Sequence, residues 1–242
     1  MTYCLSLLCR EGVVFLADSR TSAGVDNITV HPKMRVYARE GDRVFCLMSS
    51  GNLSITQSVS ALLDHDLAGD GANLLNRANF YETVRYVGGK IREVSALDAE
   101  ALKRSGLTFD VNLILGGQIG MQPAEIYKIY AEGNAIHASV ESPFLQIGEL
   151  KYGKPILDRG FTFETPLKEA VKFGLLSLDA TAKSNLSVGT PFEIFSYEAG
   201  SLAVRHRVRL DENDGYLKRV REDWQRGLSE LVSKIPPLDF ES

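Results

Sequence analysis

The chain has 242 residues, of which 44% are hydrophobic and 24% charged, so it can bury the core of a folded globular protein. Its formal net charge of −4, with lysines and arginines spread along the chain, disfavours nucleic acid as a partner. No apolar run approaches the about 18 residues of a membrane span, and the start has no basic, apolar signal peptide. We therefore expect a cytoplasmic protein with one domain over 1–242, in which 211–242 form a C-terminal helix and tail.

The cysteines and histidines exclude several kinds of site. Three cysteines and four histidines show none of the local spacings that build a zinc site, so we expect no metal and no cofactor. Cys4, Cys9 and Cys46 lie in apolar strand patterns and are expected to be reduced core thiols. The sequence has no Gly-x-Ser-x-Gly elbow and no glycine-rich phosphate loop, which leaves serine-hydrolase and nucleotide-binding functions unsupported.

The first element is a predicted hairpin. Two apolar runs, 2–9 and 13–17, predict buried strands joined by a tight turn. A hairpin returns the end of its second strand to the start of its first, so Asp18 is expected beside Thr2. If Met1 is removed, the Thr2 hydroxyl gains the α-amine of its own residue as a base, and such amines titrate at roughly 7.7–8.0. Thr2 is therefore a candidate nucleophile.

An extended segment at 28–37 carries the candidate cation of the site, Lys33. An ammonium between Asp18 and Thr2 would form an ion pair with the carboxylate, and its charge would favour the deprotonated amine and hydroxyl. Arg35 has the same strand parity and is the alternative cation, although a guanidinium cannot exchange protons near neutral pH.

The next strand, predicted at 42–50, leads into a helix that starts at Leu53 with Asn52 as its N-cap. A strand that ends at a glycine before a helix exposes backbone N–H groups, and such donors can hold the oxyanion of an acyl-transfer reaction. The turn that could present such a donor lies at 49–52, where Gly51 permits close approach of a substrate. An ordinary strand-to-helix turn is the alternative interpretation.

The remaining elements are predicted from periodicity and turn residues. In chain order they are a helical stretch at 72–104, strands at 109–117 and 124–130, a helix at 166–182, strands at 192–199 and 202–210, and an amphipathic C-terminal helix. Thr165 is the predicted cap of the helix that Pro166 begins. The apolar stripe of the last helix, which includes Trp224 and Leu228, is expected to pack against its own chain, with a contact between subunits as the alternative.

Several motifs occur together in a combination typical of one family. They are Thr2, Gly-Val-Val-x-x-Ala-Asp-Ser-Arg at 12–20, Ala23–Gly24, Lys33, and Gly-Lys-Pro-Ile-Leu-Asp-Arg-Gly at 153–160. With them the chain resembles a proteasome β-type subunit over most of its length, to about Tyr197. Its start at Met-Thr-Tyr-Cys, with Asp26–Asn27, Lys33–Met34, Gly51–Leu53 and 183–189, resembles one bacterial branch, the Anbu (ancestral β-subunit) proteins. The resemblance implies an α+β fold, a four-layer αββα sandwich of two antiparallel sheets between helical layers.

The resemblance also implies an activity and a site. It implies a threonine-type N-terminal nucleophile (Ntn) hydrolase that cleaves peptide bonds of peptides or unfolded proteins in a homo-oligomeric ring or split ring. The site would comprise Thr2 as nucleophile, Asp18, Lys33, the Ser50 backbone N–H as oxyanion donor, and Asn185 and Ser187 near the amine. The acyl pocket would be lined by Thr21, Met48, Gly51 and Asn52.

Two of the departures from the family pattern lie in the loops expected near Thr2. The run Ile147–Leu150 has no serine where the family supplies one beside the nucleophile, and Glu149 is the candidate replacement. Asn185 stands where the family has an aspartate. Two other functions remain open: an Ntn amidohydrolase that acts on a small non-peptide amide, and a non-catalytic ring-forming scaffold, which retention of Met1 would favour.

Overall fold

The computed structural model describes residues 2–22 and 28–240. Two motifs of the resemblance, Ala23–Gly24 and Asp26–Asn27, and the residue Met1 lie outside the described residues.

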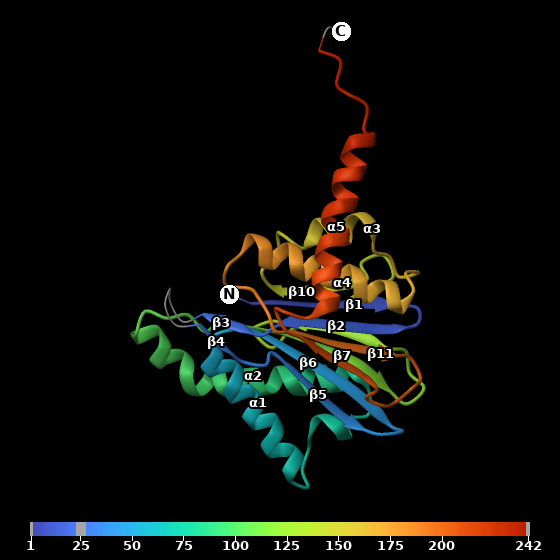
Figure 1. The fold of residues 1–242 in the computed structure, drawn as a ribbon. Helices are drawn as coiled ribbons and strands as arrows, with labels where there is room; N and C mark the ends of the chain where they lie inside the picture. Colours follow the sequence, from blue (N-terminus) through green and yellow to red (C-terminus); the bar gives the residue numbers. More distant parts are fainter. Residues whose placement is uncertain (1, 23–27, 241–242) are drawn as a thin grey trace.

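Two antiparallel five-stranded sheets stack face to face (Figure 1). The first sheet has the order β10 (Phe144–Gly148), β1 (Tyr3–Cys9), β2 (Gly12–Asp18), β11 (Phe192–Glu198), β12 (His206–Leu210). The second sheet has the order β5 (Met34–Arg39), β6 (Arg43–Gly51), β7 (Val111–Ile119), β8 (Glu125–Ile129), β9 (Ala135–His137). A short ladder of β3 (Arg20–Ser22) and β4 (Ile28–Val30) joins them at one end.

Helices cover both outer faces. The second sheet packs against α1 (Leu53–Ala68) and α2 (Phe80–Arg104), which the short 3₁₀ turn η1 (Leu74–Asn76) connects. The first sheet packs against α3 (Lys154–Gly160) and α4 (Leu167–Ser184), and α5 (Gly215–Lys234) follows β12. The predicted four-layer αββα sandwich is therefore confirmed (Figure 1).

Strand alternation explains why the first hairpin is apolar throughout. In β2, Val14 and Leu16 point into the cluster beneath α4, whereas Val13, Phe15 and Ala17 point into the cluster between the sheets. Both faces of the strand are covered, so every residue of β2 is buried. The hairpin is thus a rigid base for the residues at its open end.

Two predicted helix starts were wrong. The stretch at 72–104 begins its α-helix only at Phe80, because the Asn79 side chain caps it by accepting a bond from the Glu82 N–H at 2.9 Å. In α4, Pro166 is the N-cap and makes no side-chain cap bond; the Leu167 N–H instead donates to Glu11 Oε2 at 2.8 Å. A residue of the first hairpin turn thus caps α4.

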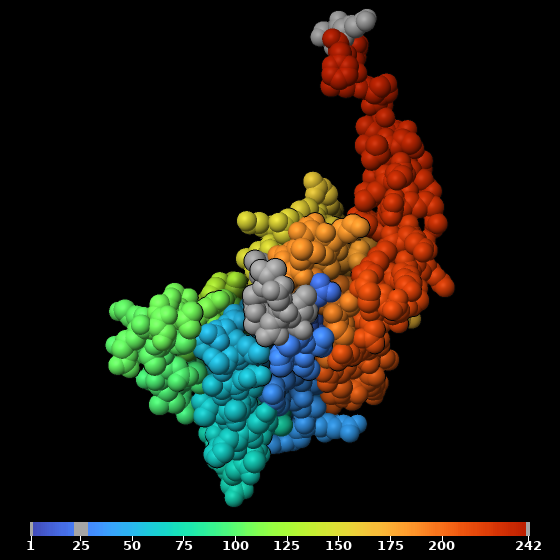
Figure 2. Space-filling view, turned by 60° about the vertical axis from the view of Figure 1, so that its left-hand side comes forward, coloured from blue at the N-terminus to red at the C-terminus, as the bar shows by residue number. Residues whose placement is uncertain are grey.

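The C-terminal helix α5 does not bury its apolar stripe, which corrects the expectation of packing within the chain. Leu217 in its first turn is buried, but Leu228, Leu231 and Ile235 are 42%, 58% and 61% exposed. Figures 1 and 2 show α5 extending away from the sandwich beyond α3 and α4. The stripe is left open to solvent in a single copy of the chain.

Tyr3 fixes the start of β1 to its neighbours. Its hydroxyl lies 2.7 Å from Ser177 Oγ on α4 and accepts a bond from Gln146 Nε2 on β10 at 2.6 Å. Ser177 Oγ also donates to the Gly153 carbonyl at 2.9 Å. Burial raises the pKa of Tyr3 to about 12, so the phenol is neutral at physiological pH.

We predict that Tyr3→Phe lowers the free energy of unfolding by about 1–3 kcal/mol, because it leaves buried polar atoms of Gln146 and Ser177 without one of their partners. Urea unfolding at fixed protein concentration measures this loss. Tyr81→Phe is the matched control, since Tyr81 is 62% exposed. Equal stabilities for the Tyr3 and Tyr81 variants would contradict the anchoring role.

Glu193 on β11 is buried, and its Oε2 has no hydrogen-bond partner in the described part of the chain. The other carboxylate oxygen, Oε1, forms an ion pair with the Arg207 guanidinium, whose Nη2 lies 3.8 Å away. Burial raises the pKa of Glu193. The folded chain therefore binds this proton more tightly than the unfolded chain, and the ionised carboxylate destabilises the fold at neutral and alkaline pH.

We predict that Glu193→Gln raises the melting temperature at pH 8 and that this advantage shrinks as the pH falls, because acid protonates the wild-type carboxyl in the folded state. Thermal unfolding at pH 8 and pH 5 measures both differences. Glu198→Gln, at the exposed end of the same strand, is the control. An advantage that is independent of pH would show that the charge is not its cause.

Candidate active site

Thr2 is held at the open end of the first hairpin. Its carbonyl accepts a bond from the Glu149 N–H at 2.7 Å, and the Tyr3 N–H donates to Asp18 Oδ1 at 2.9 Å. Gly148 has φ +84°, and a Cβ there would lie 2.0 Å from the Thr2 carbonyl oxygen. The position therefore needs glycine, which permits β10 to approach Thr2 closely.

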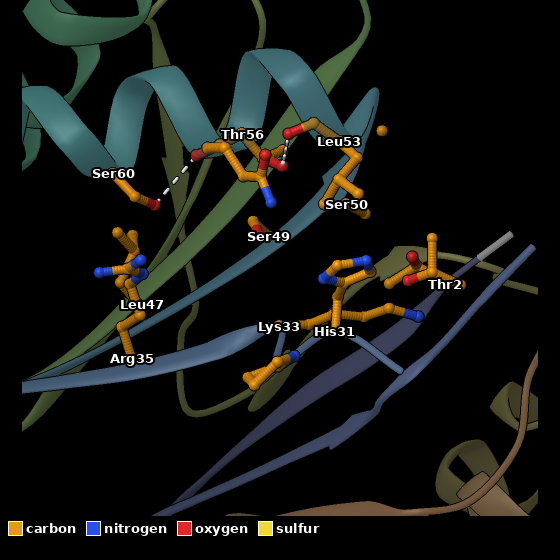
Figure 3. Close-up of a pocket in the computed structure, with 14 residues that line it drawn as sticks. Thr2, His31, Lys33, Arg35, Leu47, Ser49, Ser50, Leu53, Thr56 and Ser60 are labelled. Carbon is orange, nitrogen blue, oxygen red and sulfur yellow. Dashed lines mark hydrogen bonds between the residues drawn. The ribbon is translucent and has the colours of Figure 1, made fainter. Parts of the chain in front are cut away.

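The predicted contact between Asp18 and Lys33 is present. Lys33 Nζ donates to Asp18 Oδ1 at 2.7 Å and to the Arg20 carbonyl at 2.6 Å, and the two side chains are 7% and 0% exposed. In Figure 3 the Lys33 side chain extends toward Thr2. Arg35, the alternative cation, pairs with Asp64 at 2.6 Å instead. Lys33 is therefore the cation beside the N-terminal strand.

Asp18 is the centre of this arrangement. Burial raises the pKa of Asp18, while the Lys33 ammonium and the N–H groups of Tyr3 and Gly189 oppose the rise. The Gly189 N–H donates to Oδ2 at 3.3 Å. Asp18 thus connects the start of β1, the residue before β5 and the loop after α4. Sequence reasoning had not identified the Gly189 donor.

Strand alternation decides which backbone N–H at the end of β6 faces the site. The Ser49 N–H donates to the Lys33 carbonyl at 3.0 Å, on the β5 side, whereas the Asn52 N–H donates to the Asp110 carbonyl at 2.9 Å, on the β7 side. Successive residues of a strand direct their N–H groups to opposite sides. The Ser50 N–H therefore points at β7, and the Gly51 N–H points away from it.

Among the strands that the structure describes, none pairs with Gly51 on that side. The β5–β6 register places His31 opposite Gly51, but β5 begins only at Met34. Gly51 lines both cavities at Thr2. The sequence indicated the Ser50 N–H as the donor. The hydrogen-bond pattern of β6 favours the Gly51 N–H instead, because a bound carbonyl could reach it.

Glu149 links Thr2 to the loop that carries Asn185 and Ser187. Asn185 Nδ2 donates to Glu149 Oε2 at 3.0 Å, and the Ser187 N–H donates to Asn185 Oδ1 at 3.0 Å. Glu149 Oε1 accepts from the N–H groups of Leu150 and Lys151, each at 2.9 Å. Neither Asn185 nor Ser187 lines a cavity at Thr2. Hydrogen bonds connect these two residues to Thr2 through Glu149.

Two cavities meet at Thr2 and share Thr21, Ser50, Gly51 and Leu53. The first, of about 260 Å³, runs beneath α1; its other lining residues are His31, Pro32, Lys33, Arg35, Leu47, Ser49, Thr56, Gln57 and Ser60 (Figure 3). The second, of about 600 Å³, is lined in addition by Asn52, Asp110, Asn112, Lys128, Gly148 and Leu150.

One predicted pocket residue was wrong. Met48 is fully buried between the sheets with Cys46 and Val44, whose strand face it shares. Leu47 points the other way, toward α1, and lines the first cavity. Asn52 lines the second cavity and also caps α1, as predicted, by accepting a bond from the Ser54 N–H at 3.0 Å.

Sequence reasoning missed most of the cavity residues. A signal for the first cavity existed: Thr56 and Ser60 are polar residues spaced by four on the buried face of α1. In the described ranges, no group of three His, Cys, Asp or Glu side chains could hold a metal ion. Among the same residues, no helix combines the length and apolar character needed to cross a membrane.

No protein-family model and no curated protein matches the chain, but solved structures do. An Anbu (Gly-1) mutant from Hyphomicrobium sp. strain MC1 is 40% identical, with a TM-score of 0.92 and coverage of 99% of this chain and 100% of that one. Anbu (ancestral β-subunit) from Yersinia bercovieri is 37% identical, with a TM-score of 0.93 and the same coverage.

A third structure, the helical assembly of the Anbu complex from Pseudomonas aeruginosa, is 39% identical, with a TM-score of 0.94 and coverage of 98% of each chain. These likenesses extend over nearly the full length of this chain and of the three others, and they agree with the αββα sandwich. The chain belongs to the Anbu family of proteasome-like β-subunit relatives and has their Ntn-hydrolase fold.

Proposed function

We propose that the protein is a threonine-type endopeptidase that cleaves peptide bonds once Met1 has been removed. The observation that carries this proposal is the buried Lys33–Asp18 ion pair beside Thr2, with Nζ and Oδ1 2.7 Å apart. Burying two charges costs desolvation energy and stabilises a fold weakly. Charged groups placed in this way next to a hydroxyl nucleophile are typical of catalytic sites.

The proposed reaction has two steps. Thr2 Oγ attacks the substrate carbonyl carbon, and the Thr2 α-amine accepts the hydroxyl proton. That proton passes to the leaving nitrogen as the C–N bond breaks, which leaves an ester on Thr2. Water then hydrolyses the ester and restores the hydroxyl. The Lys33 charge stabilises the developing negative charge on Oγ, and Asp18 holds Lys33 in place.

We assign the oxyanion to the Gly51 N–H. This donor faces the side of β6 on which β5 has ended, whereas the Ser50 N–H points at β7. A backbone donor at the mouth of both cavities would meet the carbonyl oxygen of a peptide that spans them. Cavities on both sides of Thr2 favour a peptide or unfolded protein over a small amide as the substrate.

We further propose that the protein works as a homo-oligomer. The relative from Pseudomonas aeruginosa forms a helical assembly. In this chain, Leu228 and Leu231 of α5 and Ile235, which caps its C-terminal end, are exposed in one stripe, and such a contiguous apolar surface is typical of a protein interface. We propose that this stripe contacts a neighbouring copy, so that peptides are cleaved within the assembly.

The nucleophile is tested by substitution. We predict that Thr2→Ala lowers kcat for a fluorogenic peptide about a thousandfold or more, because it removes the attacking atom. Thr2→Ser keeps the hydroxyl and retains measurable activity. Cleavage by the Thr2→Ala variant at the wild-type rate would contradict the assignment.

The role of the ion pair needs a variant that leaves no buried charge unpaired. In the double variant Asp18→Asn with Lys33→Met, both charges are removed together, so we expect a folded protein with kcat reduced about a hundredfold or more. Arg35→Met, in the same cavity, is the control and is expected to keep kcat within about threefold. A fully active double variant would show that the pair is structural only.

A further inference from the structure

The second cavity contains a cation that the proposed mechanism does not use. Lys128 on β8 lines this cavity together with Thr2, Gly51 and Asn112. At about 600 Å³, the cavity is larger than the one beneath α1 and has room for more than one residue of a bound peptide.

The sheet register places Lys128 and Asn112 side by side. Lys128 lies directly opposite Ile114 in the β7–β8 ladder, and Asn112 is two residues from Ile114 along β7. Residues two apart in a strand share a face, so Asn112 and Lys128 are diagonal neighbours on one side of the sheet. Ile114 belongs to the cluster between the sheets. The amide and the ammonium thus occupy the open end of the space between the two sheets.

Lys128 lacks a carboxylate partner. Among residues 2–22 and 28–240, no ion pair involves Lys128, whose Nζ sits 5.1 Å from the centre of the Tyr130 ring. Burial lowers the pKa of Lys128, since its charge is partly desolvated. Such a cation favours a bound anion that replaces its lost hydration.

The other charges around the cavity are engaged elsewhere or exposed. Lys33 is paired with Asp18, and the Glu149 carboxylate accepts three hydrogen bonds from its own segment and Asn185. Asp110 also lines the cavity but is exposed to solvent. The unpaired positive charge of Lys128 therefore dominates the interior of the cavity.

The position of the Thr2 α-amine indicates which part of a substrate enters this cavity. The β1–β10 register pairs Tyr3 with Gly148, so continuing it places the amino end of Thr2 next to Glu149 and Leu150. Leu150 lines the second cavity and not the first. Because the α-amine delivers the proton to the leaving nitrogen, the leaving group lies on this side.

We propose that the second cavity is a leaving-group subsite that binds a carboxylate on the residue after the scissile bond, with Lys128 and Asn112 as its ligands. This inference rests on the proposed peptidase function, since it names the substrate class of the same site. The carboxylate is either the side chain of Asp or Glu or the C-terminal carboxylate of a substrate that ends there.

A binding experiment tests the subsite without requiring cleavage. The probes are dye-labelled peptides that begin with Glu or with Gln and represent the leaving group, and the receptor is the assembled Thr2→Ala protein. We expect the Glu peptide to bind about tenfold more tightly in fluorescence anisotropy, the difference typical of one charge-assisted hydrogen bond. Lys128→Met in this background is expected to abolish the difference, and Lys128→Arg to retain it.

The control and the folding check use residues of the same region. Lys151→Met removes an exposed lysine near Leu150 that lines neither cavity, and is expected to leave the tenfold difference unchanged. Circular dichroism and the melting temperature verify that Lys128→Met is folded. Equal binding of the Glu and Gln peptides, or a preference that survives Lys128→Met, would overturn the inference.

Cleavage by the wild type then distinguishes the two sources of the carboxylate. Three substrates share one acyl part and end in Gln-amide, Glu-amide or Gln with a free carboxylate. A higher kcat/KM for the Glu-amide than for the Gln-amide identifies a side-chain carboxylate, and a higher value for the free acid identifies a C-terminal one. If no peptide is cleaved but binding keeps its dependence on Lys128, the proposed function fails and the subsite stands.

Discussion

The site depends on one buried interaction, the ion pair between Asp18 and Lys33. The two carboxylate oxygens of Asp18 accept hydrogen bonds from Lys33, Tyr3 and Gly189, which belong to three segments far apart in the sequence. A buried carboxylate must have such partners, because an unpaired charge in the interior is strongly destabilising. The requirement to satisfy Asp18 therefore assembles the end of the sandwich at which Thr2 lies.

Alternating residues of β6 have different roles, because the two faces of the strand meet different neighbours. On β6, the inward residues Cys46 and Met48 fill the space between the sheets, while Leu47 and Ser49 face α1 and line the first cavity. At the end of the same strand, alternation turns the Gly51 N–H toward the side where β5 has ended. A single strand, β6, thus contributes core residues, cavity residues and the proposed oxyanion donor, because β7 pairs with it up to Gly51 whereas β5 pairs with it only up to Met48.

Sequence reasoning predicted what local rules determine. The hairpin placed Asp18 beside Thr2, the family resemblance indicated Lys33, and strand parity gave Arg35 as its alternative. Ser50 and Met48 could not be assigned in this way, since the direction of an N–H or side chain depends on which neighbouring strand it meets. The bond from Gly189 to Asp18 and the proximity of Lys128 to Thr2 depend on tertiary register, which no single segment encodes.

The most direct measurement of the central claim is the intact mass of the purified protein before and after treatment with a peptide epoxyketone, which couples to both the amine and the hydroxyl of an N-terminal threonine. The account predicts that Met1 is absent and that one inhibitor molecule is added per chain, at Thr2. A processed chain whose Thr2 remains unmodified would contradict the claim that the Lys33–Asp18 pair supports a reactive nucleophile.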